Sequence, residues 1–190
     1  ELKDVPPRRR AQCISVLAQQ APAVPLTCFE LALCGRSPYT GFLGRLGPDD
    51  IMAAEHALKA LGIEHLRDRP LNRLSGGQRQ KAYLAMIVAQ DTPLVVLDEP
   101  ATFMDMAYEK QFFKLIYGLK QDYKKTIICV MHNLNTAVRY ADNFLVLHEG
   151  KLAFFGSRQD FLKGDIPQKI FNLKRYYADD GTGGEKLFFG

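Results

Sequence analysis

Two hydrophobic patterns alternate along the chain, short apolar runs and longer stretches with helical spacing. The short runs predict strands over Cys13 to Leu17, Leu94 to Leu97 and Thr126 to Met131. Between the last two, Met106 to Tyr123 carries apolar residues at helical spacing, which predicts a helix with one face in the core. From Leu74 onward helices and strands alternate, so we expect an α/β fold with a parallel sheet covered by helices.

Two further helices are predicted between the first and second strands. Thr27 and Glu30 have the spacing of a capping box, so one helix should begin there and reach Leu33 or Cys34. The second should run from Asp49 to Leu61, with Ile51, Ala54, Leu58 and Leu61 on one face and Gly62 ending it.

The sequence of the last third of the chain predicts a β-hairpin followed by a C-terminal tail. Phe144 to Leu147 and Leu152 to Phe155 flank Glu149-Gly150, which indicates an antiparallel hairpin at the edge of the sheet. Asp179 to Gly184 is polar and rich in glycine, so we expect a C-terminal tail there.

Composition excludes several classes of protein. The 190 residues carry a formal net charge of +4, without the basic stripe of a nucleic-acid-binding surface. The four cysteines form no CxxC pair and lie in apolar stretches, so we expect free thiols in a reducing compartment. Uncharged apolar runs fall short of the about 18 residues that span a membrane, which places any membrane role outside the lipid.

Leu74-Ser75-Gly76-Gly77-Gln78 opens a predicted helix that reaches Gln90. Ser75 and Gln78 have capping-box spacing, and a capped helix alone would explain them. Each glycine costs about 1 kcal/mol against alanine inside a helix, yet bare backbone N–H groups at a helix N-terminus bind phosphate. An anion site and a plain turn both remain open at this point.

Two strand ends carry polar residues. Leu94 to Leu97 is followed by Asp98, Glu99 and Pro100, and adjacent carboxylates at the carboxyl end of a strand need a neutralising charge such as Mg²⁺. The alternative is a solvated turn before proline. His132 follows the third strand, where an imidazole would bond phosphate or orient water, although a lone histidine there is more often a loop residue.

In this order the motifs resemble the ATP-binding cassette (ABC) family. LSGGQ at 74–78 is similar to its signature, LVVLDEP at 94–100 to its Walker B strand and catalytic glutamate, His132 to its switch histidine and Gln19 to its Q-loop glutamine. The resemblance covers about Cys13 to Gly156. GRSPY at 35–39 and the stretch 74–90 look most like ATPase subunits of bacterial importers for iron-siderophores, haem and cobalamin.

The resemblance implies a P-loop NTPase-like sheet with flanking helices and a helical subdomain. It divides one incomplete domain into strand and Q-loop (1–25), helical subdomain (26–73), signature, Walker B, D-loop and H-loop core (74–156), and C-terminal helix and tail (157–190). It implies that Asp98 and Gln19 hold Mg²⁺, Glu99 polarises water and His132 contacts the γ-phosphate of ATP. Ser75, Gly76 and Gly77 would grip the γ-phosphate of ATP bound to the opposite subunit of a homodimer. Gln78 and Asp105, the D-loop aspartate, would also contribute to nucleotide binding.

The implied partners are a second ATPase subunit and membrane permeases, with the protein peripheral on the cytoplasmic face of the membrane. Two departures stand out. Phe103 is bulkier than the family's D-loop usually shows, and GxxxxGK[ST] occurs nowhere in the 190 residues. We therefore expect a fragment that lacks the N-terminal part of the fold and is inactive alone.

Two alternative functions stay open. One is a noncatalytic truncated cassette or remnant. The other is a nontransport ABC ATPase, but only 55 residues separate Gln19 from Ser75, too few for the coiled coil of the repair and chromosome types.

Overall fold

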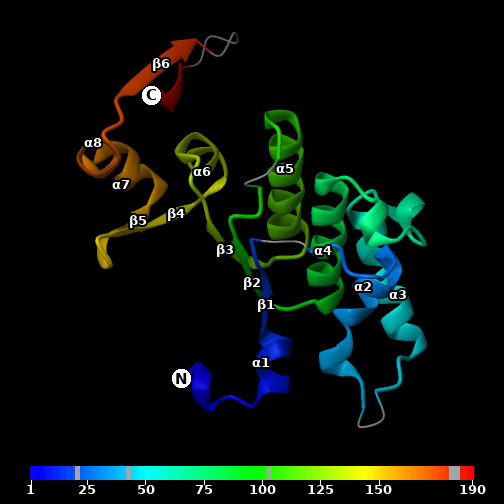
Figure 1. The fold of residues 1–190 in the computed structure, drawn as a ribbon. Coiled ribbons are helices and arrows are strands. Elements are labelled where there is room, and N and C mark those ends of the chain that lie inside the picture. Colours follow the sequence, from blue (N-terminus) through cyan, green and yellow to red (C-terminus); the bar gives the residue numbers. More distant parts are fainter. Residues whose placement is uncertain (20–21, 42–43, 102–103, 180–184) are drawn as a thin grey trace. The chain divides into compact units, whose positions relative to one another are not determined.

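The computed structural model describes the chain except residues 20–21, 42–43, 102–103 and 180–184 (Figure 1). The chain divides into two compact units, Glu1–Val130 and Met131–Gly190, and each is described by itself. Among the described residues, none of the helices combines the length and the apolar character that crossing a bilayer requires.

The described residues of the first unit form three strands, five α-helices and four short 3-10 turns. In chain order these are η1 (Leu2–Asp4), α1 (Pro7–Cys13), β1 (Ile14–Leu17), α2 (Cys28–Cys34), η2 (Ser37–Tyr39), α3 (Pro48–Ala60), η3 (Glu64–Leu66), η4 (Leu71–Arg73), α4 (Gly76–Gln90), β2 (Leu94–Asp98), α5 (Met106–Asp122) and β3 (Thr126–Val130).

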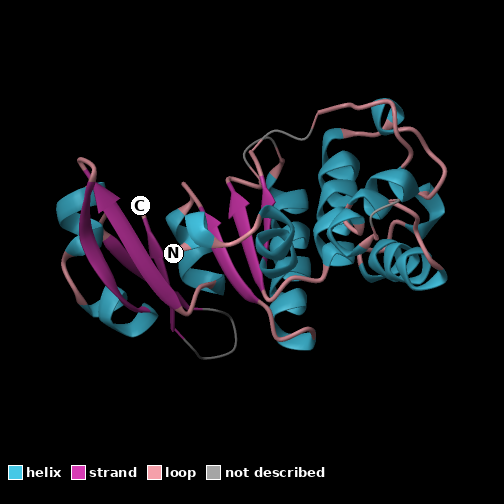
Figure 2. Cartoon of the chain, turned by 90° about the horizontal axis from the view of Figure 1, so that it is seen from below, coloured by secondary structure: helices cyan, strands magenta, loops and turns pink. Residues whose placement is uncertain are grey.

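The predicted parallel sheet is confirmed. Its strand order is β1-β2-β3, and Val16, Val96 and Ile128 are aligned across it. Ser15, Leu17, Val95 and Leu97 are buried on one face, and α4 and α5 lie to one side of the strands (Figures 1 and 2).

The second face of the sheet is partly exposed in the part of the chain that the structure describes. Side chains alternate between the two faces of a strand, and the second face leaves Val16 57%, Ile128 53% and Val130 46% exposed. The apolar sequence of these strands is typical of strands that are packed on both faces. The sequence of a strand alone does not show whether another element covers its second face.

The helices before the signature form as predicted. Thr27 and Glu30 make a reciprocal capping box at the start of α2. After α3, Gly62 adopts φ +65°, its N–H donates to Lys59 O at 3.0 Å and the next N–H, of Ile63, donates to Leu58 O at 3.0 Å. This pair of bonds is the Schellman ending that favours glycine. Ile51 departs from the expected face, being 42% exposed, because the buried stripe of α3 starts at Ala54.

The second unit contains α6 (Leu134–Tyr140), β4 (Asn143–His148), β5 (Lys151–Ser157), α7 (Arg158–Lys163), α8 (Ile166–Phe171), β6 (Arg175–Asp179) and β7 (Glu185–Phe189). Phe144 and Phe161 stack with centroids 4.2 Å apart at its core. The predicted hairpin is confirmed as β4 and β5.

That hairpin is a two-stranded sheet of its own, so its placement at the edge of the parallel sheet was wrong for the described residues. The end of the chain also differs from the prediction, which was one helix followed by a tail. It forms α7, α8 and the antiparallel pair β6 and β7, in which Tyr176 stacks on Phe188. Most of the predicted loose segment, 180–184, lies outside the described residues.

Candidate functional site

Two carboxylates stand at the carboxyl end of β2, as predicted. Asp98 is the last residue of the strand and is exposed, and Glu99 follows it. Glu99 has φ 45° and its N–H donates to Val130 O at 3.2 Å. Residues other than glycine seldom occupy this left-handed region, and such backbone strain is concentrated at functional sites. The hydrogen bond to β3 helps hold Glu99 in that conformation.

The structure brings Gln19 and Glu99 together. Gln19 Nε2 donates to Glu99 Oε2 at 2.7 Å, although the residues are 80 positions apart. The parallel register pairs Leu17 with Leu97, so the carboxyl ends of β1 and β2 lie side by side at the same end of the sheet. A carboxamide and a carboxylate in direct contact at that edge make a polar site at the place where open α/β sheets bind ligands.

Cys129 lies near these carboxylates but is not a nucleophile. Burial, and secondarily the charge of Asp98, raises the pKa of the Cys129 thiol to about 12. The residue therefore stays protonated and acts as part of the sheet's packing. All four cysteines are free thiols, as expected.

The signature segment forms the predicted cap of α4. The Gln78 N–H donates to Ser75 Oγ at 3.3 Å, and the Ser75 N–H donates to Gln78 Oε1 at 3.1 Å. A Cβ placed on Gly76 would meet no atom within 4 Å, whereas one on Gly77 would lie 3.3 Å from the Tyr108 ring. Space is open above Gly76, and the first-turn N–H groups have no acceptor within their own helix.

Asp105 has a structural contact that the sequence analysis missed. Its Oδ1 accepts the N–H groups of Ala107 and Tyr108, both at 3.0 Å, so Asp105 is the N-cap of α5. Tyr108 in turn lies against Gly77, which sets the beginnings of α4 and α5 side by side. An aspartate before a helical run was a usable signal for the cap, while nothing in the sequence pointed to Tyr108. Phe103 lies outside the described residues.

His132 belongs to the second unit. It is exposed and precedes Asn133, whose side chain accepts the Thr136 N–H at the start of α6. The Asn133 cap fixes the backbone conformation directly after His132. Its assignment to a phosphate stays a prediction.

The donor set suits a magnesium ion shared with phosphate. Among the described residues, no group of three or more histidine, cysteine, aspartate or glutamate side chains is placed to hold a metal. Mg²⁺ is usually bound by one or two carboxylates together with water and substrate phosphates, rather than by a protein cage. Asp98, exposed at the end of β2, fits that arrangement.

The parallel sheet, the paired strand-end carboxylates and the capped glycine helix define a nucleotide-binding cassette. The sequence profile of the ABC transporter family matches residues 2–102, and the chain belongs to this family.

Individual relatives show which members of the family the chain is similar to. The ferric enterobactin transport ATP-binding protein FepC of Escherichia coli (strain K12) is 35% identical, over 93% of this chain and 66% of its own length. The siderophore transport system ATP-binding protein YusV of Bacillus subtilis (strain 168) is 34% identical, over 96% of this chain and 67% of its own length. The chain thus spans about two thirds of these relatives, and they confirm the expected resemblance to siderophore importer ATPases.

Solved structures agree with the fold. An inward-facing structure of a metal-chelate type ABC transporter gives a TM-score of 0.86 at 26% identity, covering 94% of this chain and 71% of that one. The dimeric ABC transporter cassette MJ0796 gives 0.67 at 25% identity, covering 80% and 65%.

Proposed function

We propose that the chain is part of the ATP-hydrolysing subunit of an ABC transporter that powers import of iron-siderophore complexes. The contact between Gln19 and Glu99 at the strand ends carries the proposal. The names of the relatives FepC and YusV support the class of substrate. The permease partners and a peripheral position on the cytoplasmic face of the membrane are part of the same proposal.

Glu99 orients and polarises the water that attacks the γ-phosphate. A carboxylate is a suitable acceptor for a water proton, and the hydrogen bond from Gln19 fixes the position of one of its oxygens. Asp98 and Gln19 would hold Mg²⁺, which would supply positive charge to the transferred phosphoryl group. The protein contributes mainly position and charge to such a reaction.

The signature residues bind the γ-phosphate of ATP held by a second copy of the cassette. Open space above Gly76 supports this, as does its position at the N-terminus of α4, where backbone N–H groups attract phosphate. Ser75 Oγ accepts one bond from the helix and retains its own hydrogen for a phosphate oxygen. Gln78 keeps the cap in place, and Asp105 places the start of α5 beside it. His132 contacts a different γ-phosphate, the one that the water polarised by Glu99 attacks.

The test is Mg²⁺-dependent release of inorganic phosphate from ATP. Because GxxxxGK[ST] occurs nowhere in the 190 residues, we expect no turnover by this chain alone. Joining it to the phosphate-loop segment of FepC should give hydrolysis, and Glu99→Gln in that fusion should lower kcat by roughly 10²- to 10⁴-fold.

The matched control is Glu64→Gln, an exposed glutamate in η3 that should leave the rate unchanged. Hydrolysis that survives Glu99→Gln would refute the role of Glu99. A fusion that binds ATP but hydrolyses none would favour the noncatalytic alternative.

A further inference from the structure

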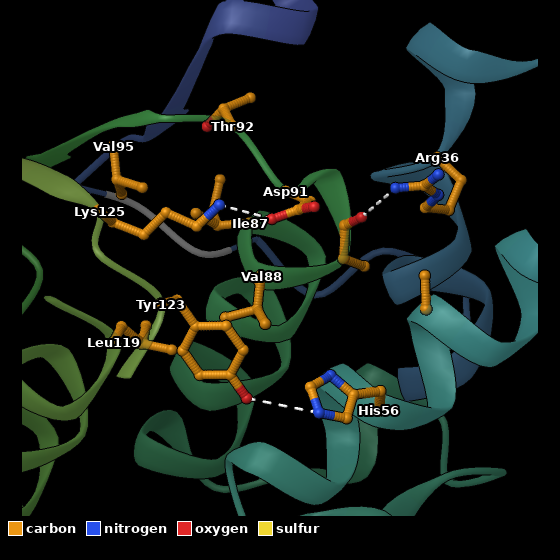
Figure 3. A pocket seen from close by; sticks show the side chains of 12 residues that line it. Arg36, His56, Ile87, Val88, Asp91, Thr92, Val95, Leu119, Tyr123 and Lys125 are labelled. Atoms are coloured by element: carbon orange, nitrogen blue, oxygen red, sulfur yellow. Dashed lines mark hydrogen bonds and ion pairs between the residues drawn. The ribbon is translucent and has the colours of Figure 1, made fainter. Parts of the chain in front are cut away.

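A cavity of about 310 Å³ lies in the first unit, away from the strand ends that carry Asp98 and Glu99. It is bounded by α3, by the C-terminal turns of α4 and α5, and by the beginning of β2 (Figure 3). Small-molecule pockets have volumes of about 300–1,000 Å³, so this one suits a ligand with one or two rings.

The interior of the cavity is apolar. Ile87, Val88, Val95 and Leu119 line it, and the rings of Tyr123 and His56 lie close together in the same lining (Figure 3). Tyr123 Oη lies 3.5 Å from His56 Nε2, and the two rings are edge to face with centroids 5.9 Å apart. Aliphatic and aromatic walls of this kind favour a flat apolar body.

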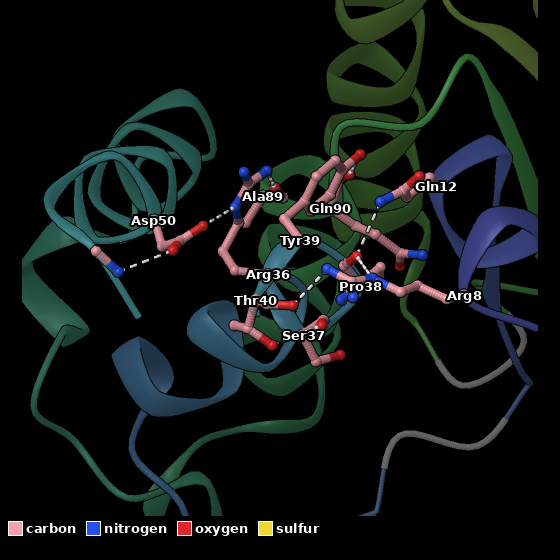
Figure 4. Close-up of polar contacts among 11 residues, drawn as sticks. Arg8, Gln12, Arg36, Ser37, Pro38, Tyr39, Thr40, Asp50, Ala89 and Gln90 are labelled. Atoms are coloured by element: carbon pink, nitrogen blue, oxygen red, sulfur yellow. Dashed lines mark hydrogen bonds and ion pairs between the residues drawn. The ribbon is translucent and has the colours of Figure 1, made fainter. Parts of the chain in front are cut away.

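Two cations flank this interior. Lys125 Nζ pairs with Asp91 Oδ1 at 2.5 Å, and the lysine side chain is only 16% exposed while that of Asp91 is 67% exposed. On the other side Arg36, 13% exposed, bridges Asp50 and the carbonyl of Ala89 (Figures 3 and 4).

The negative end of the α4 dipole is already compensated. Its last carbonyls accept hydrogen bonds from the Asp91 N–H at 3.1 Å (Val88 O), from Arg36 at 2.7 Å (Ala89 O) and from the Tyr39 hydroxyl at 2.8 Å (Gln90 O). The helix end therefore does not oppose an anion as an uncapped one would. Asp50 balances the charge of Arg36, and Asp91 balances that of Lys125. The cavity therefore presents one unbalanced positive charge only when the exposed Asp91 carboxylate turns away from Lys125 into water.

We propose that this cavity binds a small aromatic monocarboxylate. The ligand's carboxylate pairs with Lys125, replacing or sharing the contact of Asp91, whose exposed carboxylate returns to water at little cost. Its rings pack against Val88, Val95 and Leu119. Such an occupant touches α3 and α5 together and holds the helical segment against the strand-bearing part of the unit.

The probe is 2-naphthoate, compared with its neutral counterpart 2-naphthamide, titrated into the methyl-labelled full chain and followed by NMR. We expect saturable shifts of the Val88, Val95 and Leu119 methyl signals with naphthoate. Naphthamide keeps an oxygen acceptor for Lys125 but lacks the negative charge, so it should bind about tenfold more weakly or worse.

Variants then locate the site. Lys125→Met should weaken naphthoate binding by about tenfold or more, while Lys59→Met, the same change at an exposed lysine of α3, should leave it unchanged. Ala53→Leu should abolish binding by filling the cavity while Lys125 remains.

Equal affinities of naphthoate and naphthamide would overturn the proposal. So would saturable naphthoate binding that does not shift the methyl signals of Val88, Val95 and Leu119, or binding that Lys125→Met does not weaken. The comparison of the two probes on the unaltered chain decides the matter even if a variant fails to fold.

Discussion

A buried pair of hydroxyl groups joins β1 to the start of β2, and it yields a stability prediction with a definite asymmetry. Ser15 and Thr92 are each 1% exposed and their hydroxyl oxygens lie 2.8 Å apart. Thr92 Oγ1 also donates to Leu94 O at 2.9 Å. Since a hydroxyl has one hydrogen, Ser15 must be the donor and Thr92 the acceptor in the pair.

The two single substitutions should therefore differ in cost. Thr92→Val keeps the shape but removes both bonds and leaves the buried Ser15 O–H without this acceptor, so we expect a loss of about 2 kcal/mol. Ser15→Ala leaves the Thr92 bond to Leu94 intact and should cost about 1 kcal/mol. In the double variant the orphaned donor is gone, so its cost should fall about 1 kcal/mol short of the sum.

Hydrogen exchange of peptides covering β1 and β2 measures these losses where they occur. Because about 1.4 kcal/mol corresponds to a tenfold change in an equilibrium constant, protection should fall roughly thirtyfold in Thr92→Val and roughly fivefold in Ser15→Ala. Thr126→Val, the same change at an exposed strand residue, serves as the control. A cost of Ser15→Ala equal to or above that of Thr92→Val would refute the donor assignment, and strict additivity would show that the pair is not coupled.

Two further stability predictions follow. Gly62→Ala forces a side chain into φ +65° at the end of α3 and should cost about 1 kcal/mol, seen as a fall of the thermal midpoint by roughly 2–4 °C. The pKa of Asp50 is held below its usual value by the Gly47 N–H and then by Arg36, so its stabilisation is present above about pH 4 and is lost as pH falls through the lowered pKa. Asp50→Asn should thus lower the urea midpoint at pH 7 but progressively less at acidic pH, whereas the exposed neighbour Asp49, changed to Asn, should have little effect at either pH.

The parts of the fold predicted well are those whose signal is local. The caps at Thr27 and Ser75 and the stop at Gly62 depend on residues within one turn, and the long helix after Asp105 has a full apolar stripe. The helix Pro7–Cys13 was missed because its arginines give no such stripe, and it takes Cys13 out of the expected strand.

The hairpin at the end of the chain shows a different limit. Tyr176 and Phe188 stack with centroids 5.7 Å apart, so the two strands stabilise one another across the sequence between them. The glycine-rich stretch suggested a tail because composition alone does not show that aromatic residues on either side will pair.

For the candidate site, residue types were predictable and contacts were not. The motif residues Asp98 and Glu99 stood out by their place after an apolar strand, but the bond from Gln19 requires the register of β1 against β2. Neither the left-handed backbone of Glu99 nor the contact of Tyr108 with Gly77 has a sequence signal, because both arise from packing between distant segments.

The register of the sheet also decides from which side Asp98 can be reached. Leu94, Val96 and Asp98 share one face of β2, and Val96 is aligned with the exposed Val16 and Ile128. The opposite face, with Val95 and Leu97, is buried. A cation that pairs with Asp98 therefore approaches along the exposed apolar face. The surface that leaves the apolar side chains of this sheet in water is thus the one that gives access to its carboxylate.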